Sequence, residues 1–148
     1  MIGIPRIVSP DMLTVLMEMG HGDSLVIGDA NFPAHSVARA SGGRAVRADA
    51  ARVSDLLDAI LTLMPLDDAV HTPILGMVDP SCALSEAHET FQSVLARHGY
   101  DPERMALLSK ADFYQRAAHS YAILASGDPE RFANLILTKG VVTYAKKT

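Results

Sequence analysis

The chain has 148 residues, of which 49% are apolar and 20% charged, and a formal net charge of −4. This composition excludes a disordered chain, and the weak charge argues against duplex nucleic acid and anionic membranes as partners. Since no apolar stretch has the length of a signal peptide or a membrane span, and the single Cys82 cannot form an internal disulfide, we expect one cytoplasmic domain over residues 1–148.

The first predicted helix begins at Ser9-Pro10-Asp11, where serine can cap the helix and proline suits its first position. Apolar residues then recur at helical spacing up to Met19, and Gly20 is a natural stop. The segment 38–43 is small and flexible in character. The remaining patterns predict strands at 24–28, 44–47, 73–78, 105–108, 121–125 and 135–137, and helices at 51–64, 85–99 and 109–117. The terminal Lys146-Lys147 pair is expected to form a solvated tail.

Strands that alternate with helices predict an α/β fold, with a largely parallel central sheet and helices on both of its faces. In such open sheets, ligands bind at the carboxyl ends of the strands. The strand 24–28 ends at Asp29, and His21 lies between two glycines just before it. We therefore place the working site in the stretch from Gly20 to Ser36.

The individual residues of this stretch allow two interpretations each. The imidazole of His21 suits proton transfer near neutral pH, but a histidine at this position equally suits the negative end of the preceding helix. Asp29 can accept hydrogen bonds from sugar hydroxyls or orient a histidine, or it can bind its own backbone in an Asx turn. Asp23, at the start of the strand, is expected to be structural.

Two further groups of residues are candidate sites. His21, Asp29 and His35 lack the spacing of a zinc site, so no metal is expected. Near predicted strand ends lie Lys110, Phe113, Tyr114, Arg116 and the segment Phe132-Ala133-Asn134. A positive charge, an aromatic face and an amide suit a carbohydrate pocket, although an aromatic core with a solvated lysine would give the same pattern.

Four stretches of the chain together resemble the ribose pyranase and fucose mutarotase family, most closely its fucose mutarotase branch. The resemblance runs nearly end to end and is carried by Gly20-His21-Gly22-Asp23 with the helix before it, by 29–36, by 47–49 with 53–57, and by Phe113-Tyr114-Gln115-Arg116-Ala117 together with 132–140.

The resemblance implies a ribose pyranase-like fold and an isomerase that needs no cofactor. It implies a free monosaccharide as substrate, with His21 as the catalytic acid/base and Asp29, Lys110, Phe132, Ala133 and Asn134 as substrate-binding residues. It also implies a cytoplasmic ring-shaped homo-oligomer, a decamer, with its sites near subunit interfaces. The expected function is therefore interconversion of the α and β anomers, or of the ring forms, of L-fucose or a related aldose.

Three positions depart from the family pattern. Phe132 stands where the family has a tyrosine, Lys110 where the fucose branch has an arginine, and Asn31 where fucose relatives have a histidine. A lysine does not reproduce the planar fork of an arginine. The alternative hypothesis is therefore a non-catalytic sugar-binding or assembly module on the same fold.

Overall fold

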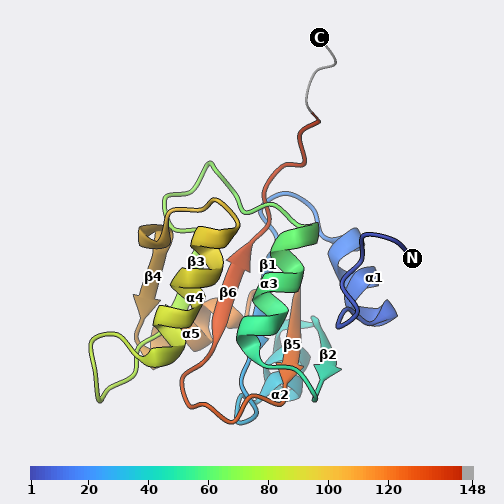
Figure 1. Ribbon diagram of the computed structural model, residues 1–148. Coiled ribbons are helices and arrows are strands. Elements are labelled where there is room, and N and C mark those ends of the chain that lie inside the picture. The colour runs from blue at the N-terminus through green and yellow to red at the C-terminus, as the bar shows by residue number, and fades with distance from the viewer. Residues whose placement is uncertain (145–148) are drawn as a thin grey trace.

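A computed structural model describes residues 1–144 of the chain, so the Lys146-Lys147 pair lies outside the described residues. Within them, a six-stranded sheet has the order β2-β5-β1-β6-β3-β4 (Figure 1). The strands are β1 (Ser24–Gly28), β2 (Arg44–Ala48), β3 (Ile74–Met77), β4 (Met105–Leu108), β5 (Ala122–Ser126) and β6 (Leu135–Thr138).

The sheet is largely parallel, as the sequence predicts, and β6 is the exception. It runs antiparallel to both of its neighbours, β1 and β3, while the other three pairings are parallel. The loop 127–134 that leads into β6 is shorter than the dozen or so residues that a parallel crossover needs. As a result, β6 begins at the edge of the sheet where β1 and β3 end.

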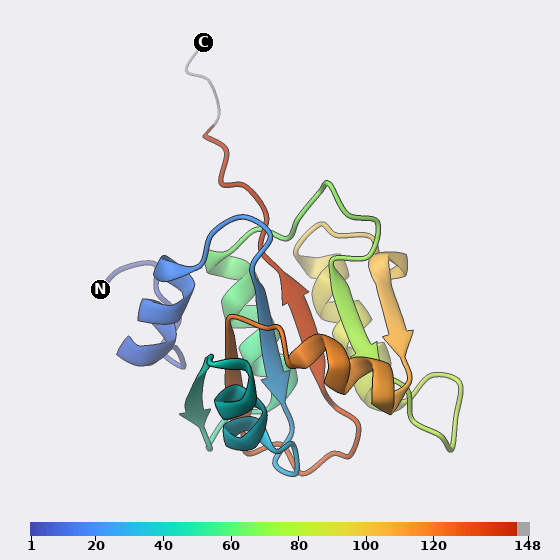
Figure 2. The ribbon, with the colours of Figure 1, turned by 180° about the vertical axis from the view of Figure 1, so that it is seen from behind.

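Helices cover both faces of the sheet, as the alternating pattern predicts. Figure 1 shows α3 and α4 in front of the sheet with α1 toward one edge, and Figure 2 shows α2 and α5 on the opposite face. The helices are α1 (Pro10–Glu18), α2 (Ala34–Ser41), α3 (Val53–Leu63), α4 (Glu86–Arg97) and α5 (Lys110–Ala117), with a short 3₁₀ turn, η1 (Pro102–Arg104).

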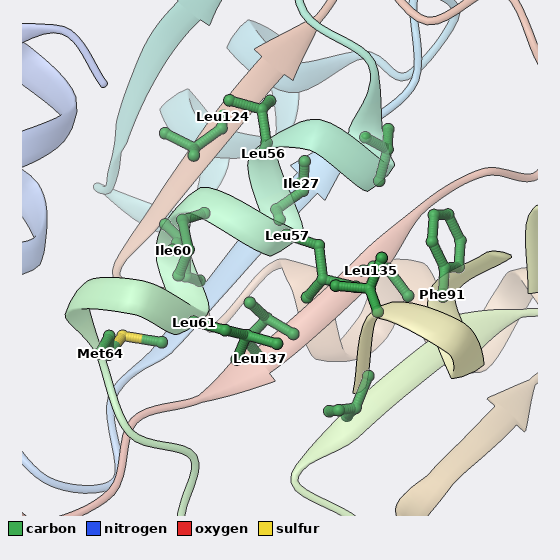
Figure 3. Packing of buried hydrophobic residues seen from close by; sticks show 14 of the residues in the cluster. Ile27, Leu56, Leu57, Ile60, Leu61, Met64, Phe91, Leu124, Leu135 and Leu137 are labelled. Carbon is green, nitrogen blue, oxygen red and sulfur yellow. The ribbon is translucent and has the colours of Figure 1, made fainter. Parts of the chain in front are cut away.

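The larger core lies between the sheet and the layer of α1, α3 and α4. Leu56, Leu57 and Ile60 of α3 are fully or almost fully buried in it. Figure 3 shows these side chains over Ile27 of β1 and Leu135 of β6. A smaller core under α2 and α5 holds Phe32 and Phe113 among other residues. Burial of apolar side chains from both faces holds the sheet in place, at roughly 1.5–3 kcal/mol per fully buried Leu, Ile or Phe.

The helix signals in the sequence correspond to real caps. Ser9 accepts a hydrogen bond from the backbone N–H of Met12 at the start of α1. At the start of α4, Ser85 and His88 cap each other reciprocally. The N–H of Val53 at the start of α3 is bound by Asp128 from a distant loop, 3.0 Å away.

The expectation of a flexible segment at 38–43 is wrong for its first four residues. They belong to α2, whose only fully buried side chains are Ala34 and Ala38. Such small side chains give a weak apolar stripe, so the helix depends on its packing against β2 and β5. It ends at Gly42, whose φ of +72° suits glycine.

Candidate functional site

A cavity of about 440 Å³ opens at the edge of the sheet where β1 and β3 end and β6 begins. Its polar lining comes from three separate segments of the chain: Asp29 and Asn31 after β1, Lys110 at the start of α5, and Arg131 and Asn134 before β6. The structure thus brings four of the predicted site residues, Asp29, Lys110, Phe132 and Asn134, into one pocket.

Asp29 and Asn134 form a reciprocal buried pair at the base of this pocket. The side-chain oxygen of Asn134 accepts a hydrogen bond from the backbone N–H of Asp29 at 2.7 Å, and its amide donates to Asp29 Oδ2 at 3.2 Å. The other carboxylate oxygen, Oδ1, accepts from the backbone N–H of Asn31 at 2.9 Å, which is the predicted Asx turn. Both interpretations of Asp29 are therefore compatible, because the same carboxylate closes a turn and faces the pocket.

The burial of Asp29 affects its ionisation. Burial raises the pKa of this carboxyl group above its ordinary value of 3.8, and the hydrogen bonds from Asn31 and Asn134 oppose the rise. The nearby charge of Asp128 adds to it. The pocket therefore holds an acceptor that is costly to ionise and depends on its donors to stay charged.

Aromatic rings form the apolar side of the pocket. Phe32 stacks on Tyr114 with their ring centroids 5.3 Å apart, and packs edge-on against the buried Phe113. The stack needs glycine at position 28, since a Cβ there would lie 2.8 Å from the Cβ of Phe32. The pocket thus combines a flat apolar surface with hydrogen-bonding groups.

Two cations lie at the mouth of the pocket. Lys110 Nζ is 5.9 Å from the centroid of the Tyr114 ring, and the Arg131 guanidinium is 5.3 Å from that of Phe132. Phe132 itself has a φ of +61°, a left-handed conformation that is unusual for a bulky residue. This backbone turn places the Phe132 ring in the lining of the pocket.

Ala133 does not line the pocket, in contrast to its prediction as a substrate-binding residue. Its side chain is 1% exposed and packs in the larger core, on the α1, α3 and α4 side of the sheet. Asn134, the next residue, enters the pocket while Ala133 lies in the core on the other side of the sheet.

His21 lies at the opposite end of β1 from Asp29, so the two ends of the Gly20 to Ser36 stretch do not form one site within this chain. A strand of five residues is about 17 Å long, and this separates the two side chains. The imidazole is about half exposed, and its Nε2 lies 3.2 Å from Oδ1 of Asp67. The carboxylate that orients His21 is therefore Asp67. The sequence instead offers Asp29 for this role.

Asp67 is well suited to hold the ring of His21. Its side chain is only 7% exposed, and its Oδ1 also accepts a hydrogen bond from the backbone N–H of Ala69. That hydrogen bond, more than the contact with His21, lowers the pKa of the carboxyl group below its ordinary value. Asp67 is thus a fixed anion next to the imidazole.

Two residues that take part in these arrangements, Arg131 and Asp67, are not among the candidates that the sequence offers. Tyr114, which follows Lys110 by four positions, the spacing of one helix face, is a sequence candidate and lines the pocket. Arg131 adjoins Phe132 in the sequence, and this adjacency is the local signal that could have identified it. Asp67 is 46 positions from His21, and no local pattern connects the two.

No three histidine, cysteine, aspartate or glutamate side chains within residues 1–144 are grouped as they would be around a metal ion. Over the same residues, none of the helices is both long enough and apolar enough to cross a membrane.

Comparison with known proteins gives matches over almost the entire chain. The model of the RbsD / FucU transport protein family matches residues 2–142. A fucose mutarotase from Bos taurus is 39% identical over 145 residues, which cover 95% of this chain and 93% of the bovine protein.

Solved structures match the fold equally well. The fucose mutarotase of Streptococcus pneumoniae in complex with L-fucose has a TM-score of 0.89 and 41% identity, with 97% of this chain and 100% of that chain covered. FucU from Bifidobacterium longum has a TM-score of 0.89 and 39% identity, with 95% of this chain and 99% of that chain covered.

Proposed function

Because this chain belongs to the RbsD / FucU transport protein family, we propose that it is a mutarotase that interconverts the α and β anomers of a free aldose, L-fucose or a close relative of it. The fucose mutarotases at 39–41% identity support this activity, and the L-fucose complex of one of them supports the substrate. The enzyme is an isomerase, and the reaction described below uses no cofactor.

The observation that carries the proposal is the pairing of Asp29 and Asn134 beside an aromatic wall. A monosaccharide presents hydroxyl groups around its edge and C–H groups on its faces. The Asp29 carboxylate can accept hydrogen bonds from hydroxyls and Lys110 can donate to them, while Phe132 packs against an apolar face of the ring. Asn134 keeps the carboxylate oriented for this task.

Mutarotation requires proton transfer at two oxygens of the sugar. A base removes the proton of the anomeric hydroxyl while an acid protonates the ring oxygen, and the bond from the anomeric carbon to the ring oxygen breaks to give the open-chain aldehyde. Rotation of the carbonyl group and closure by the reverse transfers give the other anomer. A positioned histidine suits both roles, and such catalysis contributes typically about 10²- to 10⁴-fold.

We assign this acid/base role to His21, and the distance along β1 requires that it act on another subunit. In this proposal the chain forms a ring-shaped homo-oligomer in which His21 of one subunit completes the pocket of the next. The half-exposed imidazole, held by Asp67 at the surface, supports this arrangement. The number of subunits, ten by the family resemblance, and a cytoplasmic location stay predictions.

Subunit mixing tests this assignment. His21→Asn and Asp29→Asn variants are each expected to lose enhanced anomer exchange, measured by NMR on L-fucose. Mixed by joint refolding or coexpression, they should regain about a quarter of the wild-type activity, since random assembly pairs an intact pocket with an intact histidine at that frequency. Full activity of His21→Asn alone would refute the acid/base role, and absence of any regain would refute sharing between subunits.

A second candidate function is a sugar-binding module without turnover, and the pocket itself provides the reason to consider it. Phe132 has no hydroxyl and Asn31 cannot transfer protons as a histidine does, so the pocket holds fewer proton carriers than its family pattern. A screen of L-fucose, D-ribose and L-rhamnose by saturation-transfer NMR separates the two functions. Binding without faster anomer exchange would favour the module, and faster exchange of one sugar would identify the substrate.

A further inference from the structure

Lys139, directly after β6, caps the end of α1 from the other end of the chain. Its ammonium group donates hydrogen bonds to the backbone carbonyls of Leu16, at 2.9 Å, and of Met19. The last carbonyls of a helix have no partner within the helix, and α1 has no basic residue in its own last turn. The lysine therefore supplies the positive charge that the helix end lacks, a role that the sequence had offered to His21.

The backbone of Lys139 holds the residues on the carboxyl side of His21. Its carbonyl accepts from the N–H of Gly22 and its own N–H donates to the carbonyl of Asp23, both at 2.9 Å. The carboxylate of Asp23 in turn accepts from the N–H of Gly20 at 2.7 Å, which closes the turn around the histidine. The turn containing His21 is thus fixed on one side through α1 and on the other through β6.

The same residue also lies next to the segment that carries the partner of the imidazole. Leu66 forms an isolated bridge with Lys139, and the N–H of Asp67 donates to the carbonyl of Thr138 at 3.0 Å. The backbone around Lys139 therefore touches both the turn with His21 and the segment with Asp67. Few single positions could set the distance between these two side chains so directly.

We propose that Lys139 is a positioning residue for His21: by tying the end of α1 to β6, its ammonium group keeps Nε2 of the imidazole on Asp67 and leaves Nδ1 directed away from the subunit. This inference rests on the proposed function, because it matters for catalysis only if His21 transfers protons. A carboxylate accepts hydrogen bonds, so Nε2 carries the proton of the neutral ring and Nδ1 is the nitrogen that exchanges protons with the sugar.

The test compares Lys139→Met with Arg97→Met, which removes an exposed cation of α4 that pairs with Asp58. Lys139→Met keeps the backbone bonds and loses only the ammonium group. We expect kcat for L-fucose anomer exchange to fall about 10- to 100-fold with KM within a factor of two, since the binding pocket is untouched while the acid/base is misplaced. Arg97→Met should match the wild type in both constants.

A second readout does not depend on activity. The ¹⁵N shifts of the His21 ring are expected to show one tautomer, with the proton on Nε2, in the wild type and a mixture of tautomers in Lys139→Met. A purely structural role would lower the yield of folded protein but leave kcat of the folded fraction and the tautomer unchanged, and that result would overturn the proposal. If Lys139→Met does not fold, Lys139→Gln, which keeps one donor group, should show a smaller loss of the same kind.

The two proposals can fail separately. Full activity of His21→Asn would remove the acid/base role, yet the ring tautomer would still report whether Lys139 positions the imidazole. An inactive His21→Asn together with wild-type kcat and a single tautomer in Lys139→Met would refute the role of Lys139 alone.

Discussion

Replacing Asn134 by leucine should destabilise the protein by about 2–4 kcal/mol at neutral pH. Leucine has a similar size but cannot accept from the N–H of Asp29, now bound at 2.7 Å, or donate to its carboxylate, now at 3.2 Å. A buried N–H without a partner costs about 1–3 kcal/mol, and a lost hydrogen bond to a charged group about 1.5–3 kcal/mol. The two terms share one site, so their sum is an upper limit.

The loss should depend on pH because only the ionised form of Asp29 needs the amide of Asn134. Burial already raises the pKa of this group in the folded state, so folding favours its protonated form. The contribution of Asp29 to the free energy of unfolding is therefore greatest below pH 3.8, its unfolded pKa, and falls as the pH rises through the folded pKa. Asn134→Leu raises the folded pKa further. The difference in stability between variant and wild type should therefore be larger at pH 7 than at pH 4.

Urea unfolding at pH 4 and pH 7 measures both effects. Asn31→Leu is the matched control, since Asn31 is exposed, lines the same pocket and binds Asp29 only through its backbone. It should change the free energy of unfolding by no more than about 0.5 kcal/mol. If Asn134→Leu costs no more than this control, or the same amount at both pH values, the Asp29 and Asn134 pair does not hold the pocket as described.

Two further predictions concern buried groups near the pocket. Burial lowers the pKa of His88 below its ordinary value of 6.5, so on acidification the unfolded chain binds the proton first. The free energy of unfolding should therefore fall as the pH decreases below 6.5, by at most about 1.4 kcal/mol per pH unit until the folded pKa is reached. His88→Gln keeps a capping-box side chain that does not titrate, so unfolding curves should show a weaker loss in acid, and an unchanged pH dependence would contradict this reasoning. Gly28→Ala should cost about 1–3 kcal/mol and weaken L-fucose binding, because its Cβ must push Phe32 off Tyr114; an unchanged urea midpoint would show that the ring moves freely.

Local signals in the sequence were sufficient for most of the fold. Ser9 and Gly20 mark the region of α1, and consecutive apolar residues mark β1, because caps and burial act over a few positions. The pattern could not give α2, whose buried side chains are alanines, or the cap of α3, which Asp128 supplies from a distant loop. Nor could it give the direction of β6, which depends on the length of the loop before it.

The site was predictable residue by residue but not as an arrangement. Asp29 and Asn134 were both identified, yet their contact spans 105 positions, and only the antiparallel β6 brings them together. His21 and Asp29 are close in sequence and were assigned to one site, although the strand between them separates them. The contact of His21 with Asp67 depends on tertiary structure alone, and so no spacing rule could have shown it.

The four residues of β6 also determine how the molecule tolerates insertions. Asn134 precedes this strand and Lys139 follows it, so a single short segment sets the positions of the pocket carboxylate at one edge of the sheet and of His21 at the other. One residue added within the strand would leave only one of the two in place: if Lys139 kept its position on α1, Asn134 would turn toward the core, and if Asn134 kept its position, Lys139 would move away from α1. The strand β6 therefore acts as a fixed spacer between the two ends of the site.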